Sequence, residues 1–188
     1  MSVEAAVNSI NNAAPVGVDA ILNRANALNE QIAKLQKHFR EEAKGMFANF
    51  VSEFFKTYPK VNAFAWTQYT PHYNDGEECT FRVNDYGMVY GFTPEAFEEL
   101  EFEANDLGWG SDVIANEEGT AEMVIGEYMS ATYNAWRAYR DEQLKKPKAA
   151  LDKLFAALGD DVFLSLFDNH VLVIVTRDGV DVQEYDHD

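Results

Sequence analysis

The chain has 188 residues, of which 47% are apolar and 13% aromatic, so it can bury a real core and is not a disordered acidic tail. Its 32 acidic and 15 basic side chains give a net charge of −17, which argues against direct binding to nucleic acid or an anionic membrane, because lysine and arginine supply most of the attraction to phosphate. A single cysteine, the lack of an apolar run of about 18 residues and the lack of a signal-peptide pattern together predict a cytoplasmic protein.

Three regions are expected along the chain: a flexible lead over residues 1–17, a long amphipathic helix over 18–58, and an α+β domain over 59–188. The lead is rich in Asn and Ala. The helix is expected to stop at Tyr58, because the residue before a proline, here Pro59, is disfavoured in the helical conformation.

Apolar residues in the first half of this helix recur at alternating steps of four and three, which is the spacing of a coiled coil. These residues, called the seam from here on, are Ile21, Ala25, Leu28, Ile32, Leu35 and Phe39. Two hypotheses explain the seam: it packs on other helices of the same chain, or it pairs with a second copy to form a homodimer. In the second hypothesis the oligomerisation residues are Ile21, Leu28, Ile32, Leu35 and Phe39. Beyond Glu42 the apolar residues form a wider aromatic face, which is typical of a helix that packs on a globular core.

The apolar pattern changes to a period of two after Lys60, which predicts strands. The first strand is expected over residues 61–68, with Val61 on its face of small residues and Trp66 on its larger, partly aromatic face. Turn residues follow it, and two further strands complete a β-meander. These two strands are expected over residues 79–83 and 88–92.

Helices are expected between this meander and the C-terminal part of the chain. Thr93 has the properties of an N-cap and Pro94 those of a first helical residue. Pro147 is expected to end one helix, and Gly159 the next. The expected helices cover residues 94–104, 120–146 and 149–158.

The C-terminal residues have the clearest strand pattern in the sequence. Strands are expected over 162–166, 171–175 and 180–185, which would form a second β-meander. The middle one is apolar on both faces and is predicted to be a central strand, whereas the last one alternates and is predicted to lie at an edge. The predicted fold class is therefore α+β: an antiparallel sheet built from two β-meanders, packed by helices, with a long N-terminal amphipathic helix.

Residues 66–81 hold a distinctive combination of motifs: Trp-Thr-Gln-Tyr-Thr-Pro at 66–71, Asn-Asp-Gly at 74–76 and Cys-Thr-Phe at 79–81. In these motifs the chain resembles a group of small bacterial and phage proteins. The resemblance implies a recurrent β-turn module of bacterial or phage origin, located in the cytoplasm of the bacterial host if it is phage-encoded. It implies no catalytic residue.

Motifs for catalysis are sparse. The sequence has no glycine-rich phosphate-binding loop and its four histidines are scattered, so we predict neither a cofactor nor a metal site. The acids of the turn at 75–78, beside His72, could bind Ca²⁺ or Mg²⁺ in a small metal-assisted hydrolase, although Asn-Asp-Gly ordinarily only turns the chain. Cys79, in an expected strand, is interpreted as an inert buried thiol.

Negative charge is concentrated in one part of the sequence. Fourteen acids lie between Asp75 and Glu122, where Arg82 is the only base, whereas the rest of the chain has 18 acids and 14 bases. This predicts a strongly negative face whose partner is a protein with a basic surface. The partner-binding residues expected there are Trp66, Tyr73, Asp75, Glu77, Glu78, Glu95, Glu98, Glu99, Glu101 and Trp109. For Trp109 an anchor in the core is the alternative to an exposed contact.

We interpret the chain as a non-enzymatic acidic protein-binding module: an inhibitor or assembly factor that occupies a basic surface, with mimicry of nucleic acid as one form of this function. One alternative is a structural or assembly protein that pairs through the seam. The other is the metal-assisted hydrolase that uses the turn from Asp75 to Glu78.

Overall fold

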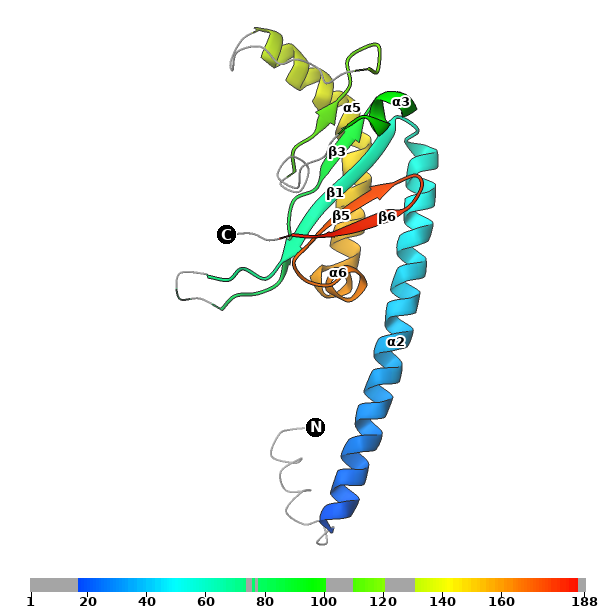
Figure 1. Cartoon of the computed structure of the whole chain (residues 1–188), viewed down its shortest axis with the longest axis vertical. Helices are drawn as coiled ribbons and strands as arrows, with labels where there is room; N and C mark the ends of the chain where they lie inside the picture. The colour runs from blue at the N-terminus through cyan, green and yellow to red at the C-terminus, as the bar shows by residue number, and fades with distance from the viewer. Residues whose placement is uncertain (1–16, 74–75, 77, 101–109, 121–130, 186–188) are drawn as a thin grey trace. The chain divides into compact units, whose positions relative to one another are not determined.

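The computed structural model describes residues 17–73, 76, 78–100, 110–120 and 131–185 (Figure 1). The chain forms two compact units, Met1–Glu42 and Ala43–Asp188, which are described separately below. The expected lead over 1–17 lies outside the described residues except for Gly17. One helix, α2 (Val18–Thr57), contains the last part of the first unit and the start of the second. It stops one residue before Tyr58, so the prediction from Pro59 is confirmed.

The second unit is an α+β structure, as predicted. Its sheet consists of β1 (Val61–Tyr69), β2 (Arg82–Val83), β3 (Gly87–Tyr90), β4 (Val113–Ile114), β5 (Val171–Thr176) and β6 (Val180–Glu184). The strand order is β4-β3-β1-β5-β6, with β2 paired to the end of β1. Every pairing is antiparallel except that of β3 with β4. As predicted, β5 is central and β6 lies at an edge.

The first predicted meander is wrong in its connectivity. Both β2 and β3 pair with β1, at different places along that long strand, and β2 contains only two residues of the expected strand over 79–83. β1 has nine residues and is long enough to pair with β3 along its first part and with β2 at its end. β3 therefore pairs with β1 directly and does not need β2 as its neighbour.

The strand expected over 162–166 is also wrong, because these residues belong to helix α6 (Asp160–Phe167). Periodicity cannot distinguish a short apolar strand from a buried helical turn. In the helix, Phe163 and Phe167 lie four residues apart, and both rings make edge contacts with Phe47. The C-terminal strands therefore form the hairpin of β5 and β6 and not a second meander.

Pro147 does not end a helix, contrary to the prediction. It lies inside α5 (Ala131–Leu158), which unites the two helices expected there. A proline in a helix interior costs about 3 kcal/mol through one lost hydrogen bond and a steric conflict. Leu144, Pro147 and Leu151 are all buried, and the packing of this face offsets that cost.

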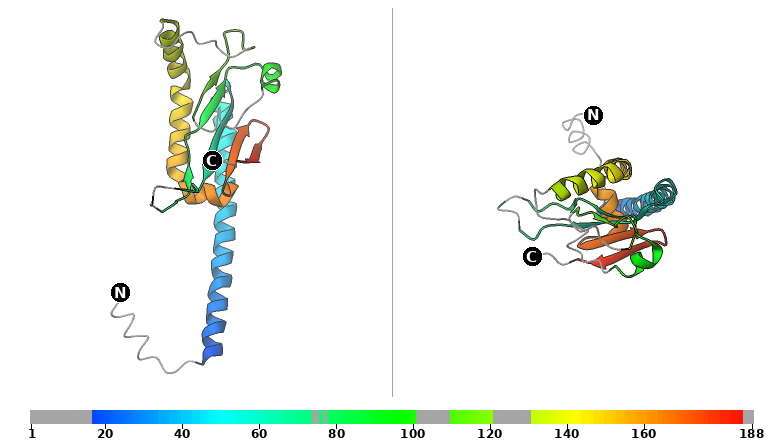
Figure 2. Two further views of the ribbon diagram at one scale, coloured as in Figure 1. Left: turned by 60° about the vertical axis from the view of Figure 1, so that its left-hand side comes forward. Right: turned by 90° about the horizontal axis from the view of Figure 1, so that it is seen from above.

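Two apolar clusters lie on opposite faces of the sheet. Figure 2 shows the ribbons of α5 and α6 on one side of the sheet. The larger one is covered by the C-terminal part of α2 and by α5 and α6, and it contains many aromatic rings. The smaller one contains Ala63, Ala65 and Val89 and is partly covered by α3 (Pro94–Glu98). From Ala63 onward, the small and the large residues of β1 thus lie on opposite faces of the sheet, as the alternation in the sequence predicted.

Val61 is the exception, because a β-bulge at Asn62 shifts the register between β1 and β3. The Asn62 side chain replaces a strand partner there: its Nδ2 donates to the Phe92 carbonyl at 2.9 Å, and its Oδ1 accepts from the Phe92 N–H at 3.0 Å. Val61 consequently packs in the larger cluster together with Phe64, and the sequence-based assignment of Val61 to the small face is wrong.

Candidate interaction surfaces

The seam residues of the first unit are strongly exposed. Five of them have between 50% and 68% of their residue surface accessible: Ile21, Leu28, Ile32, Leu35 and Phe39. Val18, three residues before Ile21, continues the same spacing and is exposed as well. The sequence-based list omitted Val18, although its position could have been found by extending the repeat one step backwards.

The residues that flank the seam carry little charge. With Ile21, Leu28 and Leu35 at heptad positions d, the e positions are Leu22, Asn29 and Gln36, and the g positions are Arg24, Gln31 and His38. Arg24 is the only fixed charge among these six residues. The other charged residues between Leu22 and Glu41 occupy outer positions; they are Glu30, Lys34, Lys37, Arg40 and Glu41. A second copy of this helix can therefore approach without repulsion between like charges.

The described acids expected on the negative face are exposed. Glu95, Glu98 and Glu99 lie on or beside α3, while Phe97 and Leu100 pack against the smaller cluster. Thr93 caps this helix, since its Oγ1 accepts from the Ala96 N–H at 3.3 Å, as predicted. In the part of the chain that the structure describes, no lysine or arginine forms an ion pair with Glu95, Glu98 or Glu99. Glu78 is exposed too.

Other predicted contact residues have different outcomes. Tyr73, between β1 and β2, is 78% exposed. Trp66 has 0% of its surface accessible, so its assignment as a partner-binding residue is wrong. It occupies the middle of β1 and contacts the rings of Phe155, Phe163 and Phe167 at centroid distances between 5.2 and 5.5 Å. Asp75, Glu77, Glu101 and Trp109 lie outside the described residues.

The residues of the Trp-Thr-Gln-Tyr-Thr-Pro motif serve the fold. Gln68 is fully buried, and its Oε1 accepts from Trp66 Nε1 at 3.0 Å while its Nε2 donates to the Phe163 carbonyl at 3.1 Å. Thr67 Oγ1 accepts from Asn84 Nδ2 at 2.9 Å. Thr70 N–H donates to Asn169 Oδ1 at 2.9 Å. The motif therefore joins β1 to α6 and to the segments next to β2 and β5.

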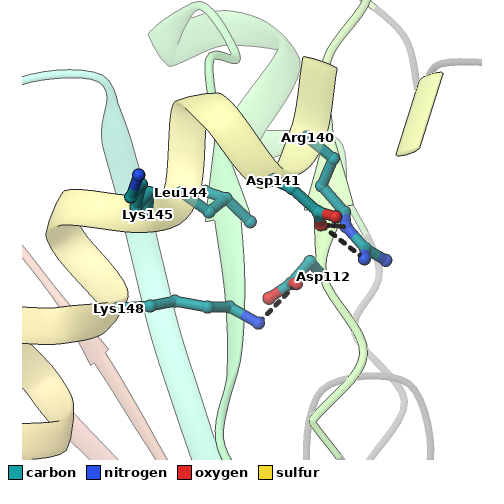
Figure 3. Close-up of a pocket in the computed structure, with 6 residues that line it drawn as sticks. All are labelled: Asp112, Arg140, Asp141, Leu144, Lys145 and Lys148. Atoms are coloured by element: carbon teal, nitrogen blue, oxygen red, sulfur yellow. Dashed lines mark hydrogen bonds and ion pairs between the residues drawn. The ribbon is translucent and has the colours of Figure 1, made fainter. Parts of the chain in front are cut away.

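A pocket of about 320 Å³ lies beside α5 (Figure 3). Its lining contains two ion pairs: Asp112 Oδ2 with Lys148 Nζ at 2.6 Å, and Asp141 Oδ1 with Arg140 Nη2 at 2.7 Å. The Asp112 side chain is only 3% exposed, and its Oδ1 accepts from the Met88 N–H at 3.2 Å. The carboxylate of Asp112 thus has partners on both oxygens, which is the arrangement of a structural link between β3 and α5.

Tyr86 adds a further contact to Lys148. Its hydroxyl lies 2.9 Å from the Lys148 carbonyl and 2.6 Å from Asp152 Oδ1. Burial and the neighbouring carboxylate of Asp152 raise the pKa of Tyr86 far above its usual range. A phenol with so high a pKa stays protonated and is a donor of hydrogen bonds, and it is unsuited to act as a base near neutral pH.

No group of three or more metal-binding side chains occurs among the described residues, and the turn proposed for a cation is described only in part. Near that turn the His72 and His170 rings stack at 5.2 Å. None of the helices in the described ranges combines the length and the apolar character that crossing a membrane requires. Comparison of the chain with models of protein families, with curated proteins and with solved structures gave no match.

Proposed function

We propose that this chain is a non-enzymatic protein-binding module that assembles with a second copy of itself through the seam of α2. The observation that carries the proposal is that, within a regular helix, at least half of the surface of each of these residues is exposed: Ile21, Leu28, Ile32, Leu35 and Phe39. Contiguous apolar surface of this kind marks interaction sites in soluble proteins. The a/d spacing specifies that the partner surface is another helix.

Energetic considerations support pairing. Full burial of an exposed leucine, isoleucine or phenylalanine side chain stabilises by about 1.5 to 3 kcal/mol. The five seam residues are only about half to two thirds exposed in the single chain, so each contributes roughly half of that value, and the ten residues of a pair together offset an association cost of about 4 to 15 kcal/mol. The flanking positions add no like-charge repulsion, since Arg24 is their only fixed charge. A second copy always has a matching seam, whereas a different protein would need one of its own.

Light scattering and sedimentation at high micromolar concentration test this proposal. We expect the wild-type chain to be a dimer, and the double variant Leu28→Asp, Leu35→Asp to be a folded monomer, because each substitution places a charge in the apolar interface. A matched control, Asn23→Asp with Asn26→Asp, adds the same two negative charges to the same helix at outer positions and should remain a dimer. A wild-type chain that is monomeric at this concentration would refute self-assembly.

A second candidate function is the binding of a protein with a basic surface by the acidic residues of the second unit. It is supported by the exposure of Glu95, Glu98 and Glu99, without an ion pair in the described part of the chain. An inhibitor that mimics nucleic acid would use its charges in this way. We place either function in the cytoplasm, in keeping with a chain whose single cysteine leaves it without an internal disulfide.

Charge reversal tests the second candidate. The partner is first isolated from a bacterial lysate, and association and dissociation rates are then measured at low and high salt. Substituting Glu95, Glu98 and Glu99 by Lys should slow association far more than it accelerates dissociation, because long-range charge acts mainly on the encounter. Binding that is insensitive both to salt and to these substitutions would assign the acids a solubilising role only.

A further inference from the structure

We propose that the two helices of the assembly run antiparallel, with Leu28 of each subunit opposite Ile32 of the partner subunit; this inference rests on the pairing proposed above. In this register Ile21 lies opposite the partner's Phe39, and Ala25 opposite the partner's Leu35. All six seam residues of each subunit then face a seam residue of the other, so no exposed apolar side chain of the seam is left without a partner.

Side-chain size favours this orientation. In a parallel pair each residue faces its own copy, so that two Ala25 side chains would meet in one layer and two Phe39 side chains in another. The first layer would leave a void and the second would force the helices apart. The antiparallel register places the small Ala25 against the large Leu35 and thereby evens out the thickness of the layers.

The next residue of the repeat after the seam, Glu42, favours the antiparallel orientation as well. Glu42 is the next residue at position d, and in a parallel pair the two Glu42 carboxylates would face each other. In the antiparallel register Glu42 lies opposite Val18 of the partner subunit, which is the first residue of α2. A carboxylate is favourable at the N-terminus of a helix, because the unpaired N–H groups there carry partial positive charge.

The distribution of net charge also favours the antiparallel orientation. Residues 1–42 hold five acids and four bases, so residues 43–188 carry −16 of the total −17. In a parallel pair, residues 43–188 of both subunits would follow the seam at the same end, and their like charges would repel each other. In an antiparallel pair, these negatively charged parts of the two subunits follow the seam at opposite ends, which reduces their repulsion. The flanking positions hold only one fixed charge, Arg24, so they supply no ion pairs that would enforce the parallel arrangement.

Distances between spin labels decide the orientation. Asn23, Glu30 and Lys37 occupy equivalent outer positions one heptad apart, and each can be replaced singly by a labelled cysteine in a Cys79→Ser background. An antiparallel pair brings the two Glu30 labels to the same height. It separates the two Asn23 labels, and likewise the two Lys37 labels, by 14 residues along the axis, about 21 Å at a rise of about 1.5 Å per residue.

We expect a short distance at Glu30 and two longer, equal distances at Asn23 and Lys37. A mixture of chains labelled at Asn23 with chains labelled at Lys37 should regain the short distance, since these two residues lie opposite each other in the antiparallel register. Three equal distances in a chain that is dimeric by light scattering would overturn the antiparallel orientation and leave the proposed pairing intact. A chain that is monomeric under the same conditions would refute the pairing itself.

Discussion

The two halves of α2 have similar apolar content and opposite environments. Phe47, Phe54 and Phe55, after Glu42, have at most 5% of their surface accessible and pack against the sheet. The seam residues before Glu42 are exposed along the same helix. The difference lies in the width of the apolar face: a wide aromatic face fits a sheet, whereas a narrow line of mostly aliphatic residues fits another helix.

The largest expected effect separates a core residue from a seam residue. Trp66→Ala removes the fully buried ring around which Phe155, Phe163 and Phe167 pack, and it should reduce the free energy of unfolding by about 3 to 5 kcal/mol. Leu28→Ala, measured at a concentration too low for pairing, should change it by less than about 0.5 kcal/mol. Chemical denaturation followed by circular dichroism measures both. Equal losses for the two variants would abolish the distinction and assign Leu28 to the core of its own chain.

A smaller effect is expected where α2 joins the sheet. Arg177, in the turn between β5 and β6, donates to the carbonyls of Phe55 at 3.1 Å and Val61 at 2.8 Å. Its guanidinium also lies 5.1 Å from the centre of the Phe55 ring. Arg177→Ala should reduce the free energy of unfolding by about 1.5 to 3 kcal/mol, because hydrogen bonds from a charged group are lost.

Lys56→Ala is the matched control in the last turn of the same helix. Lys56 forms an exposed ion pair with Glu53, which contributes less than about 1 kcal/mol. A loss in the control as large as in Arg177→Ala would mean that charge near the end of α2, and not the bonds to its carbonyls, stabilises the junction. Thermal denaturation of both variants at several salt concentrations makes the comparison.

The smallest effect is confined to alkaline pH. The pKa of Tyr86 is raised in the folded chain, so above the ordinary tyrosine value of about 10 the unfolded chain loses this proton while the folded chain keeps it. Stability should therefore be unaffected below about pH 10 and fall as the pH rises further. The fall should be shallower in Tyr86→Phe, although Tyr90, whose pKa burial also raises, will retain part of it. Denaturation midpoints measured between neutral and alkaline pH give the two slopes, and identical slopes would contradict a role for Tyr86.

Local signals in the sequence predicted many parts of this structure correctly. The proline after Tyr58 located the end of α2, Thr93 and Pro94 located the start of α3, and the apolar run of residues 171–175 identified a central strand. The spacing of the seam and its position on a helix were also readable. Each of these features is determined by residues that are close together in the chain, so a local sequence pattern is enough to predict it.

Long-range packing decided the rest. Whether residues 162–166 form a strand or a helix depends on the ring of Phe47, more than a hundred residues away, and the burial of Trp66 depends on three rings from α5 and α6. Asp112 and Lys148 likewise become partners only when β3 and α5 are packed together. Such outcomes follow from which apolar faces meet in the folded chain. The sequence by itself determined the end of α2, the cap of α3 and the spacing of the seam, because their causes are local, and the tertiary structure decided which apolar residues were left at the surface.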